Sequence, residues 1–477
     1  MNWEIVMGLE THVELSTQSK IFCGCSTAFG AASNSQCCPV CMGLPGALPV
    51  LNEKVVEYGV KVGLALGCSI TPVSRFDRKN YFYPDLPKGY QISQLYAPLC
   101  TAGRVEVAGT TIGIHEIHME EDAGKLYHDP ATGETLCDFN RCGVPLLEIV
   151  TEPDFRTAEQ VVAYLELLRE RLQYLGVSDG KMEEGSLRCD VNLSVRPVGG
   201  HTLGTRTEMK NLGSFKAIAR AIQYESQRQI ALLERGERVV QETRRFDEER
   251  GETFSMRSKE EARDYRYFPE PDLPPVVLSR EYIQDIRDHL PELGEAKRRR
   301  YAQEYQLPEY DCQMVTSHPA LARFFEELIA LGTPPKQGAN WIMGEVLGAL
   351  SARSLSPERL TITPKTLARL IQLVGEGKLN RNTAVKVFEA VFDTDGDVDE
   401  YVSAHGLEQV QDVELVENTV AQVLEENPQS VADWRGGKEK AFGYLVGQTM
   451  RKLQGKADPQ TVRRVLLERD RKPDQAI

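Results

Sequence analysis

The chain has 477 residues, with 56 basic against 70 acidic side chains and a net charge of −14. At roughly 150 residues per domain this length predicts about three domains, and the acidic balance argues against a polycationic nucleic-acid binder. No stretch approaches the roughly 18 consecutive apolar residues of a membrane span. The opening residues MNWEIVMGLETHVEL lack the basic start and cleavage site of a signal peptide. We therefore expect a cytoplasmic protein that begins at residue 1 and has no membrane partner.

The first part of the chain, residues 1–293, alternates strand-like runs with turn-rich segments. Helical periodicity occurs only locally there, at 157–175 and at about 213–236. Between these stretches, SLRCDVNLSV places apolar residues on strictly alternate positions, which is typical of a strand with one polar face. We expect an α+β domain whose sheet is mostly antiparallel and open on one side.

Helical patterns dominate after the proline-rich run at 268–275. Pairs of a capping residue and proline, which favour helix starts, begin at Ser356, Thr363 and Asp458. We expect an all-α helical domain over 294–395 and a helical tail domain over 396–477. Eight basic and three acidic residues lie between 451 and 472. This pattern favours an RNA-backbone contact, with a solvated helix face as the alternative.

The strand predicted near the amino terminus carries an acid–imidazole–acid row, Glu10, His12 and Glu14, on one face. Such a row on an open sheet face can hold a divalent cation. Other predicted strands add charged residues: Glu120, Glu121 and Asp122, then Glu148 with Glu152 on one face, and Arg188, Arg206, Glu208 and Lys210. If these strands share one sheet, the carboxylates would hold Mg²⁺ on a nucleotide and the cations would contact its phosphates. A salt-bridged sheet surface is the alternative.

The sequence contains no P-loop, dinucleotide-binding or protein-kinase motif. An ATP site would therefore lie on the sheet itself. The loop at 75–93 mixes cations, aromatic rings and amides, a combination that can bind a nucleotide or an RNA end. Arg78 and Lys79 are its candidate ATP contacts, although an ordinary ordered loop would have the same composition.

The eleven cysteines include two pairs, Cys23 with Cys25 and Cys38 with Cys41, separated by twelve residues. In a chain without an export signal, thiols or a metal site are favoured over disulfides. Two thiolate pairs joined by a loop suit tetrahedral Zn²⁺, so we expect a structural zinc site in the loop 23–41. Cys37 is a possible replacement for Cys38, and reduced free thiols are the alternative.

Eight motifs, taken in order and spacing, resemble the B subunits of the bacterial and organellar glutamyl/aspartyl-tRNA amidotransferases. They are GLETHVEL, FDRKNYFYPDLPKGYQISQ, HMEEDAGK, PLLEIVTEPD, KMEEGSLRCDVN, TEMKNLGSF, ETRRFDE and DYRYFPEPD. The resemblance runs from residue 2 to about 470 and implies a three-subunit ligase. An amidase (A) subunit would release ammonia from glutamine, and a small C subunit would clasp the pair. This chain would use ATP to phosphorylate the side chain of Glu or Asp misacylated on tRNA(Gln) or tRNA(Asn), before ammonia forms the amide.

The resemblance also implies an amino-terminal domain similar to the glutamine synthetase and guanidino-kinase fold, and a tail that contacts tRNA. The family's magnesium and catalytic positions fall on Glu10, His12, Glu120, Glu121, Glu148 and Glu208. Of Glu120 and Glu121, strand alternation favours Glu120 as the inner ligand, because Glu116 and His118 share its face. We add Lys210 to the catalytic set, and assign phosphate contacts to Arg188, Arg206 and Lys210. All four zinc cysteines, present in only part of the family, occur here.

Two other hypotheses compete with this one. The archaeal E-type relative, restricted to tRNA(Gln), carries an extra domain for which this chain has no obvious room. A zinc-stabilised tRNA scaffold, with the chemistry on another subunit, would need no catalytic sheet face. The sequence does not decide between tRNA(Gln) and tRNA(Asn).

Overall fold

The structure is a computed structural model that describes residues 2–258, 265–408, 413–453 and 457–470. The chain divides into two compact units, with the boundary after Leu293. Each unit is considered by itself. In the described residues, no helix is both long enough and apolar enough to cross a lipid bilayer.

A nine-stranded sheet forms the framework of the first unit, in the order β14-β13-β12-β11-β1-β10-β7-β6-β2. Its strands are β1 (Trp3–Glu14), β2 (Ser69–Ile70), β6 (Cys100–Val107), β7 (Thr110–Glu121), β10 (Pro145–Thr151), β11 (Leu187–Pro197), β12 (Thr207–Lys210), β13 (Glu242–Asp247) and β14 (Glu252–Ser258). Neighbouring strands are antiparallel except for the parallel pair β12 and β13. The predicted mostly antiparallel sheet is confirmed.

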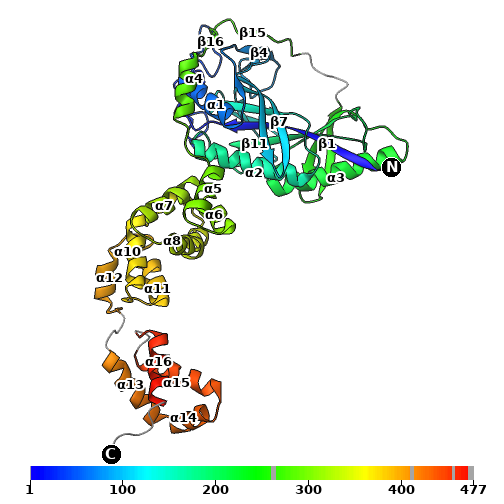
Figure 1. The fold of residues 1–477 in the computed structure, drawn as a ribbon. Helices are drawn as coiled ribbons and strands as arrows, with labels where there is room; N and C mark the ends of the chain where they lie inside the picture. Colours follow the sequence, from blue (N-terminus) through cyan, green and yellow to red (C-terminus); the bar gives the residue numbers. More distant parts are fainter. Residues whose placement is uncertain (1, 259–264, 409–412, 454–456, 471–477) are drawn as a thin grey trace, which may run out of the picture. The chain divides into compact units, whose positions relative to one another are not determined.

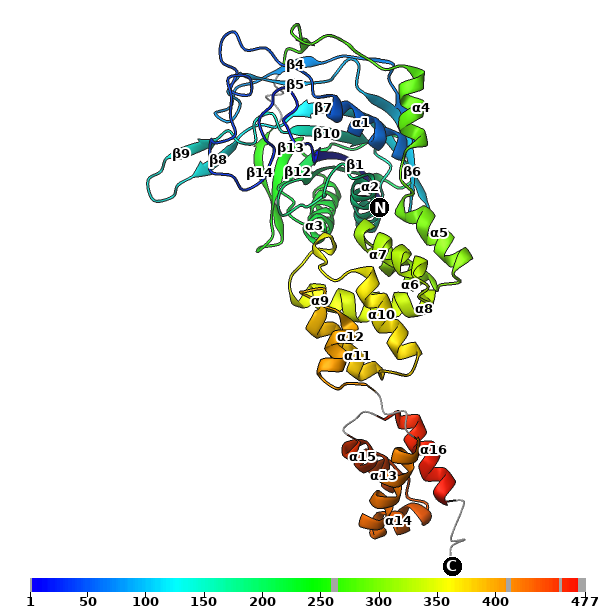
Figure 2. The same ribbon diagram turned by 90° about the vertical axis from the view of Figure 1, so that its left-hand side faces the viewer.

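Three small sheets flank this framework. They are formed by β4 (Asp77–Asn80), β5 (Tyr90–Ser93) and β15 (Phe268–Pro269), by β3 (Val73–Ser74) and β16 (Val276–Val277), and by β8 (Lys125–His128) and β9 (Thr135–Asp138). Figure 2 shows the β8–β9 hairpin projecting from the body of the unit.

Helices cover the apolar face of the large sheet. The helices of this unit are α1 (Glu53–Ala65), α2 (Ala158–Leu175), α3 (Phe215–Glu234) and α4 (Arg280–Asp288). Figure 1 shows α2 and α3 running beneath the sheet. Leu9 and Val13 of β1 share a buried core with Leu165 of α2 and Ile218 of α3. Because side chains alternate along a strand, burying this face turns the polar residues of β1 and β11 to the opposite side.

Both long helices of this unit, α2 and α3, begin at a residue whose side chain caps the helix. Thr157 and Gln160 form a capping box at the start of α2, and Gly176 ends it in the left-handed conformation. Ser214 caps α3 through the backbone N–H of Ala217. These caps satisfy backbone groups that a helix end otherwise leaves unpaired.

The second unit is helical and has two separate apolar cores. Its elements are α5 (Gly294–Glu304), α6 (Glu309–Val315), α7 (Pro319–Ala330), α8 (Pro335–Trp341), a π-helical turn (Ile342–Val346), α9 (Leu347–Ala352), a 3₁₀ turn (Pro357–Arg359), α10 (Pro364–Gly375), α11 (Arg381–Val391), α12 (Val398–Ala404), α13 (Val413–Glu426), α14 (Pro428–Arg435), α15 (Glu439–Lys452) and α16 (Pro459–Asp470). The prediction of an α+β part followed by helices is confirmed.

The two cores place the helices in two groups. The first core includes Val398 and Val402 of α12, so it extends past residue 395, the predicted end of the helical domain. The second core begins with Val416 of α13. Of the predicted helix starts, Thr363 caps α10, whereas Ser356 opens only the short 3₁₀ turn.

Candidate functional site

The polar face of the large sheet collects charged residues from five strands. In the strand register His12 of β1 lies opposite Glu148 of β10 on one side and Arg188 of β11 on the other. Glu148 in turn lies opposite His118 of β7. Directly paired residues of adjacent strands point to the same face. The register alone therefore gathers the imidazoles and carboxylates in the middle of the sheet.

The first cluster consists of His12, Glu120 and Glu148, whose ligand atoms all lie within 4.8 Å of one another. His12 Nδ1 is 3.2 Å from Glu120 Oε1 and 4.0 Å from Glu148 Oε2. His118 lies behind the two carboxylates, with Nε2 3.0 Å from Glu148 and 3.7 Å from Glu120. A carboxylate–imidazole set of this kind suits a divalent cation.

The charges of this cluster are strongly coupled. Burial disfavours charged His12, but its hydrogen bond with Glu120 and the charge of Glu148 outweigh burial and raise the pKa of the imidazole. Burial likewise opposes ionisation of Glu120, yet its bonds with His118 and His12 hold its pKa well below the usual range. The cluster therefore balances carboxylates with imidazolium protons. A bound divalent cation would supply the same positive charge in their place.

The second cluster consists of Glu10, Asp190 and Glu208, again with ligand atoms within 4.8 Å of one another. Asn192 donates a hydrogen bond of 2.9 Å to Glu10, and Thr243 donates one of 2.8 Å to Glu208. Burial, together with the charges of Glu148 and Glu208, raises the pKa of Glu10. Asp190 was not among the predicted site residues. It lies opposite Glu10 in the register, and its place on the polar face of SLRCDVNLSV was the pattern that could have found it.

Four of the predicted cations lie at or near these clusters. Lys210 binds Asp190 and lies 3.1 Å from Glu208. Arg188 donates to Asp122 at 2.7 Å. Burial disfavours the charged ammonium of Lys79, but the charges of Glu120 and Glu148 and the neighbouring tyrosines together outweigh burial and raise its pKa. Arg206 is exposed and lines a cavity of about 210 Å³ together with Glu10 and Asn192.

Arg78, by contrast, does not join the clusters. Its guanidinium pairs with Glu270 at 2.6 Å and with Asp272 at 3.0 Å, and it stacks 4.2 Å from the centre of the Tyr90 ring. Both carboxylates are about 190 residues away along the chain, so the sequence alone could not reveal this pairing. The arrangement ties β4 to the segment after β15.

Two predicted carboxylates also lie outside the two clusters. Glu121 faces away from Glu120, because alternate residues of β7 point to opposite sides; its carboxylate binds Lys88 and accepts from the backbone N–H of Ile92. Glu152 follows the end of β10 at Thr151 and lies in neither cluster. It pairs with exposed His115 at 2.8 Å instead.

Glu14 ends the polar row of β1. Burial, together with the charge of Asp122, raises its pKa to about 8. It lies in neither cluster.

The cysteine cluster brings Cys23, Cys25, Cys38 and Cys41 together, with all four sulfurs within 4.8 Å of one another. The sulfurs of Cys38 and Cys41 are 3.9 Å apart. A hydrogen bond with Cys23 lowers the pKa of the Cys41 thiol, and the backbone N–H of Cys38 and the charge of Lys20 act in the same direction. Cys37 instead points to the Asn140 side chain at 3.7 Å.

Comparison with known proteins gives a consistent picture over the whole chain. Residues 5–284 match a family model described as the GatB/GatE catalytic domain, and residues 323–469 match one described as the GatB domain. Relatives named as the B subunit of aspartyl/glutamyl-tRNA(Asn/Gln) amidotransferase include those of Lachnoclostridium phytofermentans, 56% identical over 98% of both chains, and Geotalea daltonii, 53% identical over 98% of this chain and 99% of the relative. The chain belongs to the family of amidotransferase B subunits.

This membership confirms the resemblance drawn from the motifs and makes the chain part of a tRNA-dependent amidotransferase, a carbon–nitrogen ligase. The full-length matches to relatives named as B subunits set aside the E-type hypothesis. Both carboxylate clusters and the cysteine cluster lie within the segment that matches the GatB/GatE catalytic domain.

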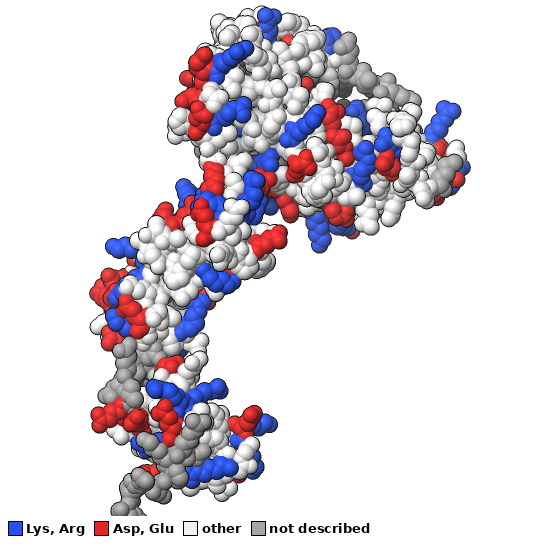
Figure 3. Space-filling model, viewed as in Figure 1, with Lys and Arg blue, Asp and Glu red and all other residues white. Residues whose placement is uncertain are grey.

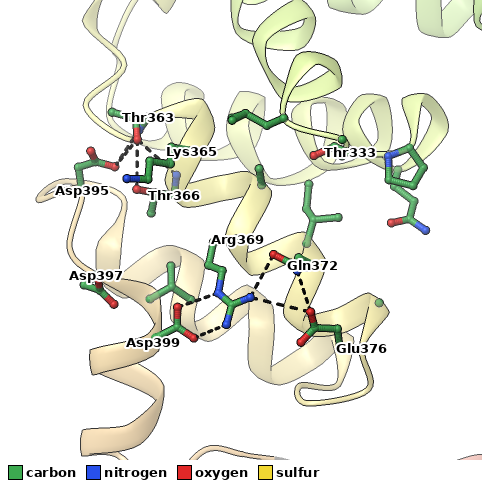
Figure 4. A pocket seen from close by; sticks show the side chains of 18 residues that line it. Thr333, Thr363, Lys365, Thr366, Arg369, Gln372, Glu376, Asp395, Asp397 and Asp399 are labelled. Atoms are coloured by element: carbon green, nitrogen blue, oxygen red, sulfur yellow. Dashed lines mark hydrogen bonds and ion pairs between the residues drawn. The ribbon is translucent and has the colours of Figure 1, made fainter.

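A further cavity of this amidotransferase chain lies away from these clusters, in the helical unit. It has a volume of about 940 Å³ and is bounded by the start of α8, by α10 and by the loop before α12. Figure 4 shows Arg369 held between Asp399 and Gln372. Arg369 also lies 4.0 Å from Glu376, and we assign this cavity no ligand.

The tail of this amidotransferase chain presents basic residues among acidic ones. Arg463 and Arg464 of α16 are exposed, and Lys452 pairs with Glu426. Figure 3 shows the same intermixing over the helical unit. Three basic residues of the predicted RNA-contacting segment, Lys456, Arg471 and Lys472, lie outside the described residues.

Proposed function

We propose that this chain performs the ATP-dependent step in converting Glu-tRNA(Gln) to Gln-tRNA(Gln), Asp-tRNA(Asn) to Asn-tRNA(Asn), or both. In this reaction an oxygen of the side-chain carboxylate forms a bond to the γ-phosphorus of ATP, and ADP leaves. Ammonia then forms a bond to the acyl carbon, the carbon–oxygen bond to phosphate breaks, and phosphate leaves with that oxygen. The observation that carries the proposal is the pair of adjacent carboxylate clusters on the open face of the sheet.

The chemistry of the two clusters fits Mg²⁺. Magnesium prefers oxygen ligands and is bound through a few carboxylates together with nucleotide phosphates. His12, Glu120 and Glu148 would hold one ion, and Glu10, Asp190 and Glu208 another. Two buried atoms beside them, Nε of Arg188 and Oδ1 of Asn192, have no hydrogen-bond partner within the described protein. Bound, such ions neutralise the charge that develops on the phosphoryl group.

The cations beside the clusters are suited to hold phosphate oxygens in place. Lys210 contacts Asp190 and Glu208 of the second cluster, and Lys79 lies near the first. Arg188 and exposed Arg206 complete the set. Arg78 and Glu121 are not included, because each is committed to an ion pair away from the clusters. Lys and Arg in fixed positions stabilise negative charge without reorganising during the reaction.

The cysteine cluster fits structural Zn²⁺. With Zn–S bonds of about 2.3 Å, the sulfurs of a tetrahedral site are about 3.8 Å apart, and Cys38 and Cys41 are 3.9 Å apart. Four thiolates leave no open position for chemistry. The metal would hold the loop 23–41 in place.

The partners follow from the family. Nothing in the sequence resembles the serine-rich motif of an amidase, so ammonia would come from an amidase subunit, with a small third subunit holding the two together. The tRNA would contact the helical tail. A cytoplasmic location agrees with a role in supplying aminoacyl-tRNA for translation.

An oxygen-18 experiment tests the proposed chemistry. The chain is assembled with its amidase and small subunits and supplied with ATP, ammonia and Glu-tRNA(Gln) whose Glu side chain carries oxygen-18. We expect one labelled oxygen in each phosphate released, because phosphate leaves with the carboxylate oxygen. Label in AMP would indicate an adenylate, and unlabelled phosphate would separate ATP cleavage from carboxylate activation. Either result contradicts the proposal.

A further inference from the structure

Lys20 is a charged side chain that is completely buried, with no exposed surface at all. Lys20 follows Ser19, which forms a β-bridge with Ser26 at the start of the loop 23–41. Its backbone N–H bonds to the carbonyl of Cys25. Taking an ammonium group out of water is costly unless it is both hydrogen-bonded and matched by an opposite charge. The question is which group supplies that charge.

Three acceptors surround the ammonium. It donates to the carbonyl of Gln36 at 2.8 Å, to the carbonyl of Phe139 at 3.5 Å and to the sulfur of Cys41 at 3.6 Å. An ammonium has three protons, so these acceptors account for all of them. Two are neutral carbonyls, and only Cys41, itself 5% exposed, is able to carry a negative charge.

No carboxylate forms an ion pair with Lys20 within the part of the chain that the structure describes. Glu121, which lines the same small cavity as Lys20 and Cys41, takes Lys88 and a backbone N–H as its partners. Glu225 makes a useful contrast. It is equally buried, but it pairs with Arg228 at 2.7 Å and Arg244 at 3.2 Å.

We infer that Lys20 is a positioning residue of the cysteine cluster, whose buried ammonium takes the Cys41 thiolate as its counter-ion. Four thiolates around a divalent metal carry a net charge of −2, and Lys20 offsets half of it inside the fold. Its bonds to Gln36 and Phe139 fix the ammonium, so the sulfur of Cys41 is held in one place for the metal. The inference rests on the proposed metal site.

Zinc retention measures this effect directly. The full-length chain is titrated with a chromophoric zinc chelator as wild type, as Lys20→Met, which keeps an unbranched side chain of similar length without the charge, and as Lys54→Met. Lys54 is half-exposed and pairs with Glu57, so it is a control for loss of a lysine in the same unit. Loss of an outer partner of a metal ligand weakens metal affinity by ~10–100-fold, and we expect this loss for Lys20→Met alone.

The direction in which Lys20→Met shifts the urea midpoint of unfolding distinguishes pairing with the Cys41 thiolate from simple binding to the two carbonyls. In a Cys41→Ser background the ammonium has lost its counter-ion, so Lys20→Met should raise the urea midpoint of unfolding, although it lowers the midpoint in the wild-type background. A lysine that served only to bind the two carbonyls would lower the midpoint in both backgrounds. This comparison remains decisive if Lys20→Met alone folds poorly.

The outcomes are distinct. A wild-type chain that holds no zinc overturns the proposed metal site and this inference with it. A wild-type chain that holds zinc, with Lys20→Met retaining it equally well, overturns the inference alone. A lower midpoint for Lys20→Met in the Cys41→Ser background does the same.

Discussion

The hydrogen bond from Thr243 to Glu208 offers a sharp test of the second cluster. Both side chains are buried, and they face each other across the parallel pair β12 and β13, with Thr243 Oγ1 2.8 Å from Glu208 Oε2. Thr243→Val keeps the shape and removes the donor. A hydrogen bond to a charged group contributes ~1.5–3 kcal/mol, which corresponds to a ~10–100-fold change in an equilibrium constant. We expect the Mg²⁺ concentration for half-maximal ATP cleavage to rise by that factor.

The assay uses the assembled enzyme with saturating ATP, ammonia and Glu-tRNA(Gln), and varies Mg²⁺ alone. Thr207→Val is the matched control. Thr207 is a buried threonine of β12, next to Glu208 in the chain, and it also donates to a buried glutamate, Glu225, at 3.0 Å. It should lower stability without changing the Mg²⁺ dependence. If Thr243→Val and Thr207→Val show the same Mg²⁺ dependence as wild type, Glu208 is not a magnesium ligand positioned by Thr243.

Three further predictions concern stability, metal and RNA. Glu225→Gln should destabilise the chain by ~3–5 kcal/mol at neutral pH, because it breaks a buried ion pair. Although burial opposes ionisation, Arg228 lowers the pKa of Glu225. The stability that ionised Glu225 contributes is therefore present above the unfolded pKa of ~4.3 and is lost as the pH falls. The urea midpoints of wild type and Glu225→Gln should converge in acid. Cys25→Ser should lower both zinc content and melting temperature. Cys37 lies outside the cluster, so Cys37→Ser should change neither. Equal losses of zinc in the two variants would refute the proposed cluster. A chain ending at residue 407 should bind tRNA more weakly, with a shallower dependence on salt, while still amidating a minimal aminoacyl substrate; undiminished tRNA affinity would contradict the role of the tail.

The face of each strand was predictable from the sequence because side-chain alternation has a period of two. The same pattern favours Glu120 over Glu121 on the side of His118, and the structure has Glu120 beside His12 and Glu121 beside Lys88. Helices with a clear apolar periodicity were also predictable, as α2 and α3 show.

The order of the strands was not predictable by these rules, because it depends on contacts between distant parts of the chain. β1 lies between β10 and β11, more than 130 residues away along the sequence. Irregular strand registers and long-range ion pairs also cannot be predicted from strict side-chain alternation. The β7–β10 register passes over His115 between Val150 and Thr151, and this imidazole pairs with Glu152. Arg78 pairs with Glu270, which is 192 residues away along the chain.

The central claim is that the polar face of the sheet transfers the phosphoryl group. The direct measurement compares Glu10→Ala with Glu152→Ala, an exposed carboxylate outside both clusters, in the assembled enzyme with radiolabelled ATP, ammonia and Glu-tRNA(Gln). We expect Glu10→Ala to lower phosphate release and Gln-tRNA formation together by at least ~100-fold, as loss of an electrostatic stabiliser does, with tRNA binding retained and Glu152→Ala as active as wild type. Gln-tRNA formed by Glu10→Ala at the rate of Glu152→Ala would contradict the claim, and the carboxylate face would then be structural.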